Sequence, residues 1–554
     1  MIHFGVVSPF VLLIVLMASP MLGILFAAIF AQSARIPSSL RSLAWLPAAI
    51  GAGAALISAW LLRGQPAWEA IVGNWSPVSF TGLPLALTGF VPTTAVLIAW
   101  TTLYFLDSLK LPDADPFQRH PVASALLIAS LTTFALGNNL ITLLIGLGLT
   151  DLLSAYLALR RQANERNTLI GLTLNGVSIA LLTLVIAVHA AGGSSLYLPM
   201  TRLTPSVAPA LALAIALRLG FAPFRTSADV WGDMGTTASA VGGLLLLIRL
   251  PTLGIAQLPA WFYGLALVSA LLTLAIAILQ AEEDAAASIP FVRTAGVYLA
   301  ALSATPADVG VTAAAVIAWL IGSTLIAQTN TLQAESVLVE RGRRAIRVVG
   351  ALGLIGLPLT VGFIGQVGVV ATWANRGPTG WLMILAWIAS LALLVHLTLH
   401  IVFDTTRHEQ QKHLAFEPTA RLGQFALREV IGWLAATTPI VIFGVAPDLL
   451  GAGTLIEVVG RNGIVGWLGW IIAIAVGVLF WRLGPRWRPF TRGIRDHAIA
   501  VLDLGWLHSL LEGATARLRR PFGSVFTFLE SEGALLWAII VALLVVLISR
   551  PGGP

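Results

Sequence analysis

Long apolar runs occupy most of this chain, and polar residues gather in the short stretches between them. A helix needs about 20 apolar residues to cross the hydrocarbon core of a bilayer. Sixteen segments reach about that length: 9–31, 44–62, 83–106, 121–137, 140–159, 169–191, 205–224, 236–256, 260–281, 288–304, 308–328, 346–373, 381–403, 427–452, 463–481 and 533–550. They do not alternate polar and apolar residues, as the strands of a membrane β-barrel would. The pattern predicts an all-α polytopic membrane protein with about 16 transmembrane helices.

The loops after odd-numbered segments carry most of the basic residues, whereas loops after even-numbered segments carry mostly single arginines. The positive-inside rule then places the odd-to-even loops in the cytoplasm and both termini outside. One such loop is acidic, at 282–284, but acidic residues contribute little to orientation. The first segment has no basic start and no small-residue cleavage site, so it is expected to be retained. We therefore expect a multi-pass protein of a prokaryotic inner membrane.

The stretch 482–532 differs from the rest because arginines alternate there with tryptophan, leucine and phenylalanine. This mixture is typical of an amphipathic helix that lies along a membrane surface. An ordinary basic loop is the alternative. We expect a surface helix on the cytoplasmic face, followed by a last span in 533–554.

The composition agrees with solvation by lipid. Hydrophobic residues make up 57% of the chain and charged residues 10%, whereas soluble proteins carry about 25% charged residues. The absence of cysteine excludes disulfides, thiolate metal sites and cysteine nucleophiles. The net charge of +7 does not indicate nucleic-acid binding, because the arginines lie at helix ends and in one set of loops. No cofactor motif is present, so neither a cofactor nor a bound metal is expected.

Proline interrupts two apolar segments at matching places, Pro223 in 205–224 and Pro358 in 346–373. Each segment would be the fourth helix of a five-helix unit. Paired broken helices in two inverted repeats mark an ion or substrate site near the midplane, although a proline in a membrane helix is often structural. We expect both breaks to face a shared interior. The domain organisation would be 1–120, 121–256 (first repeat), 260–403 (second repeat), 404–481, 482–532 and 533–554.

Three stretches carry a family resemblance: 139–146 (NLITLLIG), 220–224 (GFAPF) and 356–363 (GLPLTVGF). They are similar to the fifth, seventh and twelfth helices of antiporter-like membrane subunits in respiratory complex I, Mrp antiporters and membrane hydrogenases. The span count and the surface helix resemble the distal subunit L of that family. The resemblance covers roughly 85–405. It implies a subunit of an NADH:quinone oxidoreductase-type or related proton/cation-translocating complex, with other membrane subunits as partners.

The chain departs from the family at the positions that would carry protons. The glutamate of the fifth helix falls at Gly148, with Asp151 one turn later. The lysine of the seventh helix matches Arg218, and the histidine after its proline matches Arg225. The lysine that follows the twelfth-helix break matches Gln366. Most of the family's proton-carrying positions are therefore neutral or fixed as arginine.

Few ionisable side chains remain in the apolar segments. Buried lysines can titrate near neutral pH, but both lysines, Lys110 and Lys412, lie outside these segments. Arginine stays protonated. Asp151 and Arg218 are expected to form one buried ion pair. Asp151 would then be either a proton acceptor modulated by Arg218 or half of a structural pair that locks two helices.

A second set of titratable residues lies four residues apart on one helical stripe: His396, His400, Asp404 and His408. Histidine titrates near neutral pH, so this stripe could be a proton half-channel open to the cytoplasm. A zinc site and plain polar groups near the interface are the alternatives. Arg225 and Asp229, after the first break, would line a cytoplasmic mouth or form a solvated loop.

Three hypotheses of function remain open at this stage. The chain could be a diverged ion-translocating subunit that takes no part in redox chemistry. It could be a scaffold that holds partner subunits in the bilayer without conducting ions. It could also be the membrane subunit of an inorganic-carbon uptake system, since such subunits belong to the same family.

Overall fold

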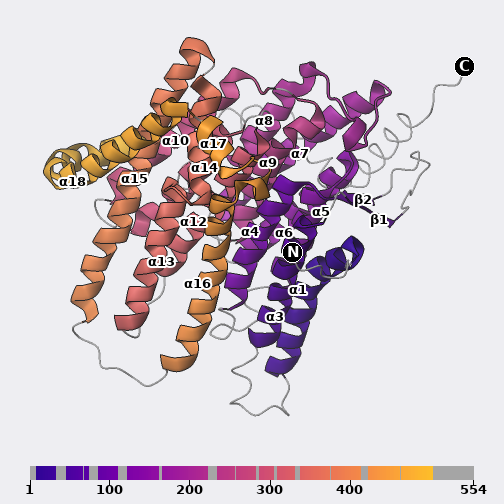
Figure 1. Cartoon of the computed structure of the whole chain (residues 1–554), viewed down its shortest axis with the longest axis horizontal. Helices are drawn as coiled ribbons and strands as arrows, with labels where there is room; N and C mark the ends of the chain where they lie inside the picture. Colours follow the sequence, from indigo (N-terminus) through magenta and orange to yellow (C-terminus); the bar gives the residue numbers. More distant parts are fainter. Residues whose placement is uncertain are drawn as a thin grey trace, which may run out of the picture.

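The computed structural model describes residues 8–32, 45–65, 68–73, 85–109, 121–160, 165–222, 234–255, 257–281, 286–304, 308–330, 337–374, 376–413, 422–461 and 463–502. These parts are helical apart from one short hairpin and the connecting turns (Figure 1). By length and composition, eight of their helices could each cross a membrane, and shorter apolar helices lie among them. The protein is therefore an all-α polytopic membrane protein, as the sequence predicted.

The elements follow the predicted order. The N-terminal part contains α1 (Pro9–Gln32), α3 (Trp45–Arg63), β1 (Glu69–Gly73), β2 (Leu85–Thr88) and α4 (Val91–Ser108). The first predicted unit contains α5 (Pro121–Leu136), α6 (Leu140–Arg160), α7 (Glu165–Ala191), η2 (Leu198–Met200), η3 (Pro205–Val207), α8 (Ala208–Leu219), α9 (Met234–Arg249) and η4 (Leu250–Leu253). The second contains α10 (Ala260–Ala281), η5 (Ala286–Ser288), α11 (Ile289–Leu302), α12 (Val309–Asn330), α13 (Val337–Ile355), α14 (Val361–Ala374) and α15 (Gly377–His413). The chain continues through α16 (Leu422–Val445), η6 (Pro447–Leu450), α17 (Leu455–Arg461) and α18 (Gly463–Leu502).

The predicted start of one helix, at residue 83 of the segment 83–106, was wrong. Residues 85–88 form β2, which pairs antiparallel with β1 through partners such as Glu69 and Thr88. The helix begins instead at Val91, where Pro92 occupies the first turn. A proline is tolerated there because the first backbone N–H groups of a helix have no partner within the helix. The apolar residues before it satisfy their backbone groups in the hairpin.

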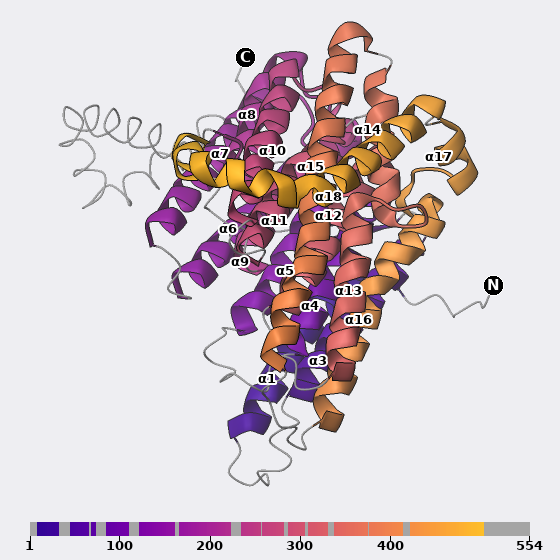
Figure 2. The same ribbon diagram turned by 90° about the vertical axis from the view of Figure 1, so that its left-hand side faces the viewer.

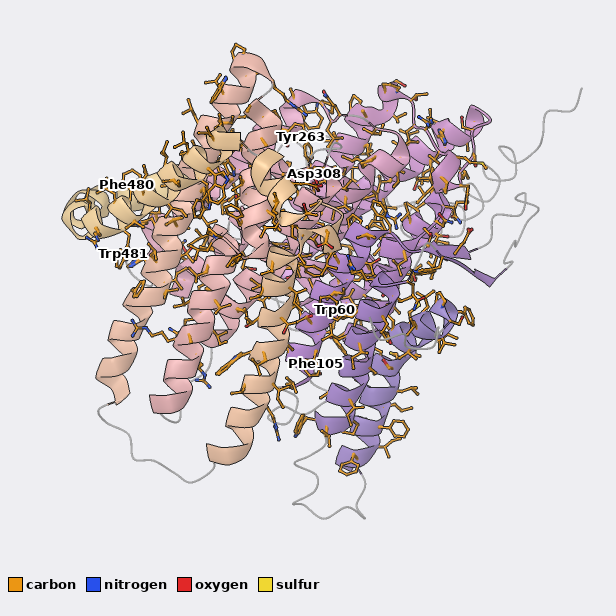
Figure 3. The ribbon with its side chains drawn as sticks, in the orientation of Figure 1. Trp60, Phe105, Tyr263, Asp308, Phe480 and Trp481 are labelled. Carbon is orange, nitrogen blue, oxygen red and sulfur yellow. The ribbon has the colours of Figure 1, made fainter. Side chains whose placement is uncertain are left out.

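Small residues and aromatic rings join the N-terminal helices to the bundle. Gly23 of α1 and Gly51 of α3 lie against each other, and a Cβ at Gly51 would come within 3.0 Å of the Gly23 Cα. Such close approach is typical of helix packing in membranes. Trp60 of α3 (labelled in Figure 3) stacks on Phe443 of α16, with ring centroids 5.2 Å apart. These contacts connect α1 and α3 to the C-terminal part of the bundle.

Helix α18 runs across the bundle instead of parallel to α13, α15 and α16 (Figure 2). It packs on α10, α14 and α15. Trp481 of α18, labelled in Figure 3, lies 5.3 Å from the ring of Phe403 of α15. The sequence predicted a boundary near residue 482, but the helix continues to Leu502. The rest of the predicted surface helix and the last predicted span lie outside the described residues.

Candidate functional site

Asp151 and Arg218 form the predicted ion pair between α6 and α8. The two guanidinium Nη atoms donate to the two carboxylate oxygens at 2.7 and 2.6 Å. Both side chains are buried, with 0% of the Arg218 side chain and 4% of the Asp151 side chain exposed. Arg218 lies in the last turn of α8, where the helix dipole also favours a cation. This bidentate geometry is the strongest form of an arginine–carboxylate contact.

Two glycines of α9 provide the space that Arg218 occupies. A Cβ at Gly242 would lie 3.4 Å from an Arg218 Nη atom and 2.9 Å from a methyl group of Leu147. A Cβ at Gly243 would lie 3.3 Å from the Arg218 Cγ. The apolar eighth segment therefore has a specific role, since its small residues let three helices close around the pair. The buried Arg218 Nε has no hydrogen-bond partner.

Helix α8 ends one residue after Arg218, at Leu219, and Gly220 forms its C-cap with a φ of 68°. The Gly220 N–H donates to the Leu217 carbonyl at 3.2 Å and the Phe221 N–H to the Ala216 carbonyl at 3.1 Å. This is a glycine C-cap of the Schellman type. The Gly220 carbonyl then accepts a hydrogen bond from the Tyr298 hydroxyl of α11 at 2.7 Å. A residue from the second predicted unit therefore satisfies the end of the broken helix in the first.

The second break has a related geometry. Helix α13 ends at Ile355, and Gly356 follows with a φ of 83°. Gly356 is buried and Pro358 is exposed, and the expectation that both breaks face a shared interior stays a prediction. Gln366 of α14 is buried. Trp387 of α15 donates to the Gln366 Oε1 at 3.1 Å.

His396 and His400 lie on one face of α15, with their rings 6.3 Å apart. His400 is buried, and its Nε2 lies 2.9 Å from the carbonyl oxygen of Ala281, the last residue of α10. Because a carbonyl can only accept, His400 donates through a protonated Nε2. Asp404 belongs to the same helix, but its side chain lies outside the described residues. Its place in a proton path stays a prediction, as does that of the two histidines.

Several predicted site residues are not placed. Pro223, Arg225 and Asp229 lie outside the described residues. No group of three potential metal ligands occurs among the residues that the structure describes. The described residues therefore bring together Asp151 with Arg218 and His396 with His400.

Besides Arg218, the structure buries several arginines that the sequence did not identify as site residues. Within the described ranges the buried arginines are Arg218, Arg249, Arg293, Arg343, Arg347 and Arg428, and Asp151 is the buried carboxylate. Arg428 lies over the ring of Trp45 at 4.2 Å, and Arg293 lies 3.4 Å from two threonine hydroxyls. An arginine inside or at the end of an apolar run is the sequence signal that could have identified them. Most of the buried charge among the described residues is thus carried by arginine.

No family profile and no curated protein matches the sequence. Solved structures nevertheless resemble the fold. An Mrp complex from Dietzia sp. DQ12-45-1b contains a chain with a TM-score of 0.62 and 16% identity, over 97% of this chain and 64% of that one. The chain thus spans 64% of the length of its Mrp counterpart.

Two respiratory complexes contain further similar chains. An archaeal membrane-bound sulfane sulfur reductase has one with a TM-score of 0.61 and 15% identity, over 97% of this chain and 100% of that one. Respiratory complex I from Thermus thermophilus has one with a TM-score of 0.53 and 17% identity, over 84% and 99%. At these identities the likeness concerns the fold. It confirms the fold that the resemblance to antiporter-like membrane subunits implied.

Proposed function

We propose that this chain is a membrane subunit of a multi-subunit, cation-translocating complex, and that its own central axis conducts protons poorly. The first part is supported by the fold shared with chains of an Mrp complex, a sulfane sulfur reductase and complex I. The second is supported by one observation, the bidentate contact between Asp151 and Arg218. Its role would then be mainly assembly, with translocation carried by sister subunits.

The chemistry of the pair is the reason for this assignment. A relay needs a group that alternates between protonated and deprotonated forms near neutral pH. An arginine side chain does not act as a proton donor or acceptor in such a relay, and Arg218 holds both carboxylate oxygens of Asp151. Proton uptake by Asp151 would leave Arg218 buried without its counter-ion. The pair is therefore suited to holding α6 against α8.

A second gap in the series of titratable groups lies between Asp151 and His400. Gln366 and Trp387 are neutral at every physiological pH, and they bond to each other at 3.1 Å. Protons travelling between Asp151 and His400 would need bridging water past this pair. This arrangement favours the scaffold over the conducting hypothesis.

Proton uptake by vesicles that contain the intact complex tests the proposal. The variants are Asp151→Asn, the double variant Asp151→Asn with Arg218→Gln, and His400→Ala. We expect the double variant to assemble and to retain proton uptake, because it removes both charges together. If the double variant assembles normally but loses most proton uptake, this subunit is a working channel and the proposal is wrong.

Arg218→Lys gives a complementary test. A buried lysine can release a proton near neutral pH. We expect this variant to increase passive proton leak through the purified subunit in liposomes, measured with an internal pH dye. Arg376→Lys is the matched control, since Arg376 stacks on Trp373 outside the pair, at 4.6 Å from that ring. An equal proton leak in Arg218→Lys and Arg376→Lys would argue against Arg218 as the group that prevents proton passage.

A further inference from the structure

A polar cavity of about 270 Å³ lies at the end of the bundle where α9 ends and α4 begins. The distribution of basic loops predicts that this end faces outward. Segments far apart in the sequence form its walls, namely the hairpin, the turn between α5 and α6, the loop before α8 and η4. Its polar lining consists of Thr88, Asn138, Thr201, Arg202, Arg249 and Thr252.

Arg249 is the buried charge in this cavity, with 2% of the residue exposed. One of its terminal nitrogens donates to the Ala135 carbonyl, and its guanidinium carbon lies 5.1 Å from the centre of the Phe90 ring. The buried Nε has no hydrogen-bond partner. Within the part of the chain that the structure describes, no carboxylate pairs with Arg249. Buried charges in proteins are normally paired, and the charge of Arg249 has no charged partner among these residues.

A purely structural role accounts for part of this geometry. Ala135 lies in the last turn of α5, and its carbonyl has no partner within the helix. Arg249 therefore caps α5 with one of its five N–H groups. The cap needs a hydrogen-bond donor but no net charge, and it leaves the buried Nε without a partner. The cap alone therefore leaves the charge of Arg249 without a counter-ion among the described residues.

The neutral donors of the cavity are already engaged. The Thr88 hydroxyl donates to the Trp68 carbonyl at 2.9 Å, and the Thr252 hydroxyl to the Arg249 carbonyl at 2.7 Å. The Thr201 hydroxyl lies within hydrogen-bond distance of two backbone carbonyls.

The nearby carboxylate is engaged as well. The amide of Asn138 donates to Glu69 at 2.7 Å, and the Tyr197 hydroxyl lies 3.2 Å from the other oxygen of this carboxylate. Glu69 is thus held by neutral groups of the hairpin face. The charged donors in the lining of the cavity belong to Arg249 and Arg202.

Backbone packing fixes Arg202 at the rim of the cavity. The Leu203 N–H donates to the Leu253 carbonyl at 2.9 Å, which joins the loop before α8 to η4. Gly254 has a φ of 73°, and a Cβ there would lie 2.9 Å from the Arg202 Cα. The missing side chain lets the two loops touch. One arginine is therefore held inside the cavity and another at its exposed edge.

We propose that this cavity binds an oxyanion, with Arg249 as its buried counter-ion and Arg202 as a second ligand at the entrance. Guanidinium groups match the geometry of phosphate, bicarbonate and carboxylate oxygens, and such bonds are shortest and strongest away from water. The oxyanion could be free in solution or belong to an anionic lipid headgroup. Both sources present the same charge and acceptor atoms.

The test uses the full chain, purified with the subunits that accompany it, in nanodiscs of phosphatidylcholine. Sodium phosphate or bicarbonate replaces the sodium salt of a bulky sulfonate at constant ionic strength while thermal unfolding is followed. We expect saturating oxyanion to raise Tm by at least about 2 °C. An unchanged Tm, or an equal rise with sodium chloride, would overturn the proposal.

Variants then locate the effect. We expect Arg249→Gln to abolish the rise in Tm and Arg202→Gln to raise the half-maximal phosphate concentration about tenfold. Arg376→Gln, an arginine outside the cavity, is the matched control and should respond as the wild type. If Arg249→Gln does not fold, the test rests on Arg202→Gln. An unchanged dependence of Tm on phosphate in Arg202→Gln then refutes the oxyanion site.

The lipid composition distinguishes the two sources of the oxyanion. In nanodiscs of phosphatidylglycerol, a headgroup that occupies the cavity would raise Tm by itself and remove the response to free phosphate. A phosphate response that persists in phosphatidylglycerol identifies the free anion as the ligand. Either result supports oxyanion binding, provided that it depends on Arg249 or Arg202.

Discussion

A double-mutant cycle on Asp151 and Arg218 tests the ion pair directly. Asp151→Asn leaves a fully buried guanidinium whose Nε already has no partner. Breaking one side of a buried pair costs about 3–5 kcal/mol, whereas replacing both sides is often nearly neutral. Asp151→Asn with Arg218→Gln removes both charges, so neither side is left as an unpaired buried ion. We therefore expect a coupling free energy of about 3 kcal/mol or more.

The assay is equilibrium unfolding of the full chain in bicelles. Because the chain contains no cysteine, two engineered cysteines can carry bulky labels that trap the unfolded state. The neutral pair Gln366 and Trp387 provides a matched control cycle, since its single interhelical bond is 3.1 Å long. Polar contacts between membrane helices are worth about 0.6 kcal/mol on average, and we expect this control to lie near that value.

The magnitude separates two explanations of the site. A coupling free energy several times that of the control means that α6 and α8 are held together by charge. A coupling for Asp151 and Arg218 below about 0.6 kcal/mol would refute the reasoning, since the pair would then contribute no more than an ordinary polar contact. The structural basis of the scaffold proposal would be lost with it.

Three further substitutions test the packing around the pair and the breaks. Gly242→Ala would place a Cβ 2.9 Å from a leucine methyl group and should cost about 1–3 kcal/mol of unfolding free energy, whereas Gly264→Ala, with no atom within 4 Å, should be neutral or slightly stabilising. Tyr298→Phe leaves the Gly220 carbonyl without its 2.7 Å partner and should cost about 1–3 kcal/mol. Gly356→Ala combines a φ of 83° with a Cβ 2.8 Å from a backbone oxygen of α14 and should cost at least about 2 kcal/mol. All are measured by the same unfolding assay, and a smaller loss for Gly242→Ala than for Gly264→Ala would contradict the packing argument.

The lengths of the apolar runs predicted the helices well because bilayer thickness limits both. The segments predicted at 140–159 and 260–281 became α6, Leu140–Arg160, and α10, Ala260–Ala281. Apolar content alone could not separate the hairpin at 85–88 from the helix behind it, since a short apolar run fits both. It also could not predict that α18 continues past residues 485 and 489, which are prolines.

The ion pair was predictable for a different reason. A carboxylate in an apolar helix requires a partner, and the resemblance to antiporter-like subunits related Asp151 and Arg218 to a glutamate and a lysine of that family. The oxyanion cavity was not predictable in this way. Its walls come from segments near residues 88, 138, 202 and 252, and periodicity says nothing about which loops meet. Arg249 ends an apolar stretch of the sequence, but its burial without a carboxylate among the described residues emerged from the fold.

The balance of buried charge links the two proposals. The described interior holds arginines at six positions and a carboxylate at one. Fixed positive charges raise the free energy of a cation nearby and lower that of an anion, most strongly where water is excluded. An interior of this kind opposes cation passage along its axis even where water could bridge the gaps. The same charges favour an anion wherever a cavity admits one, as at Arg249. Poor proton conduction and an oxyanion site would then both follow from the excess of buried arginines over buried carboxylates among the described residues.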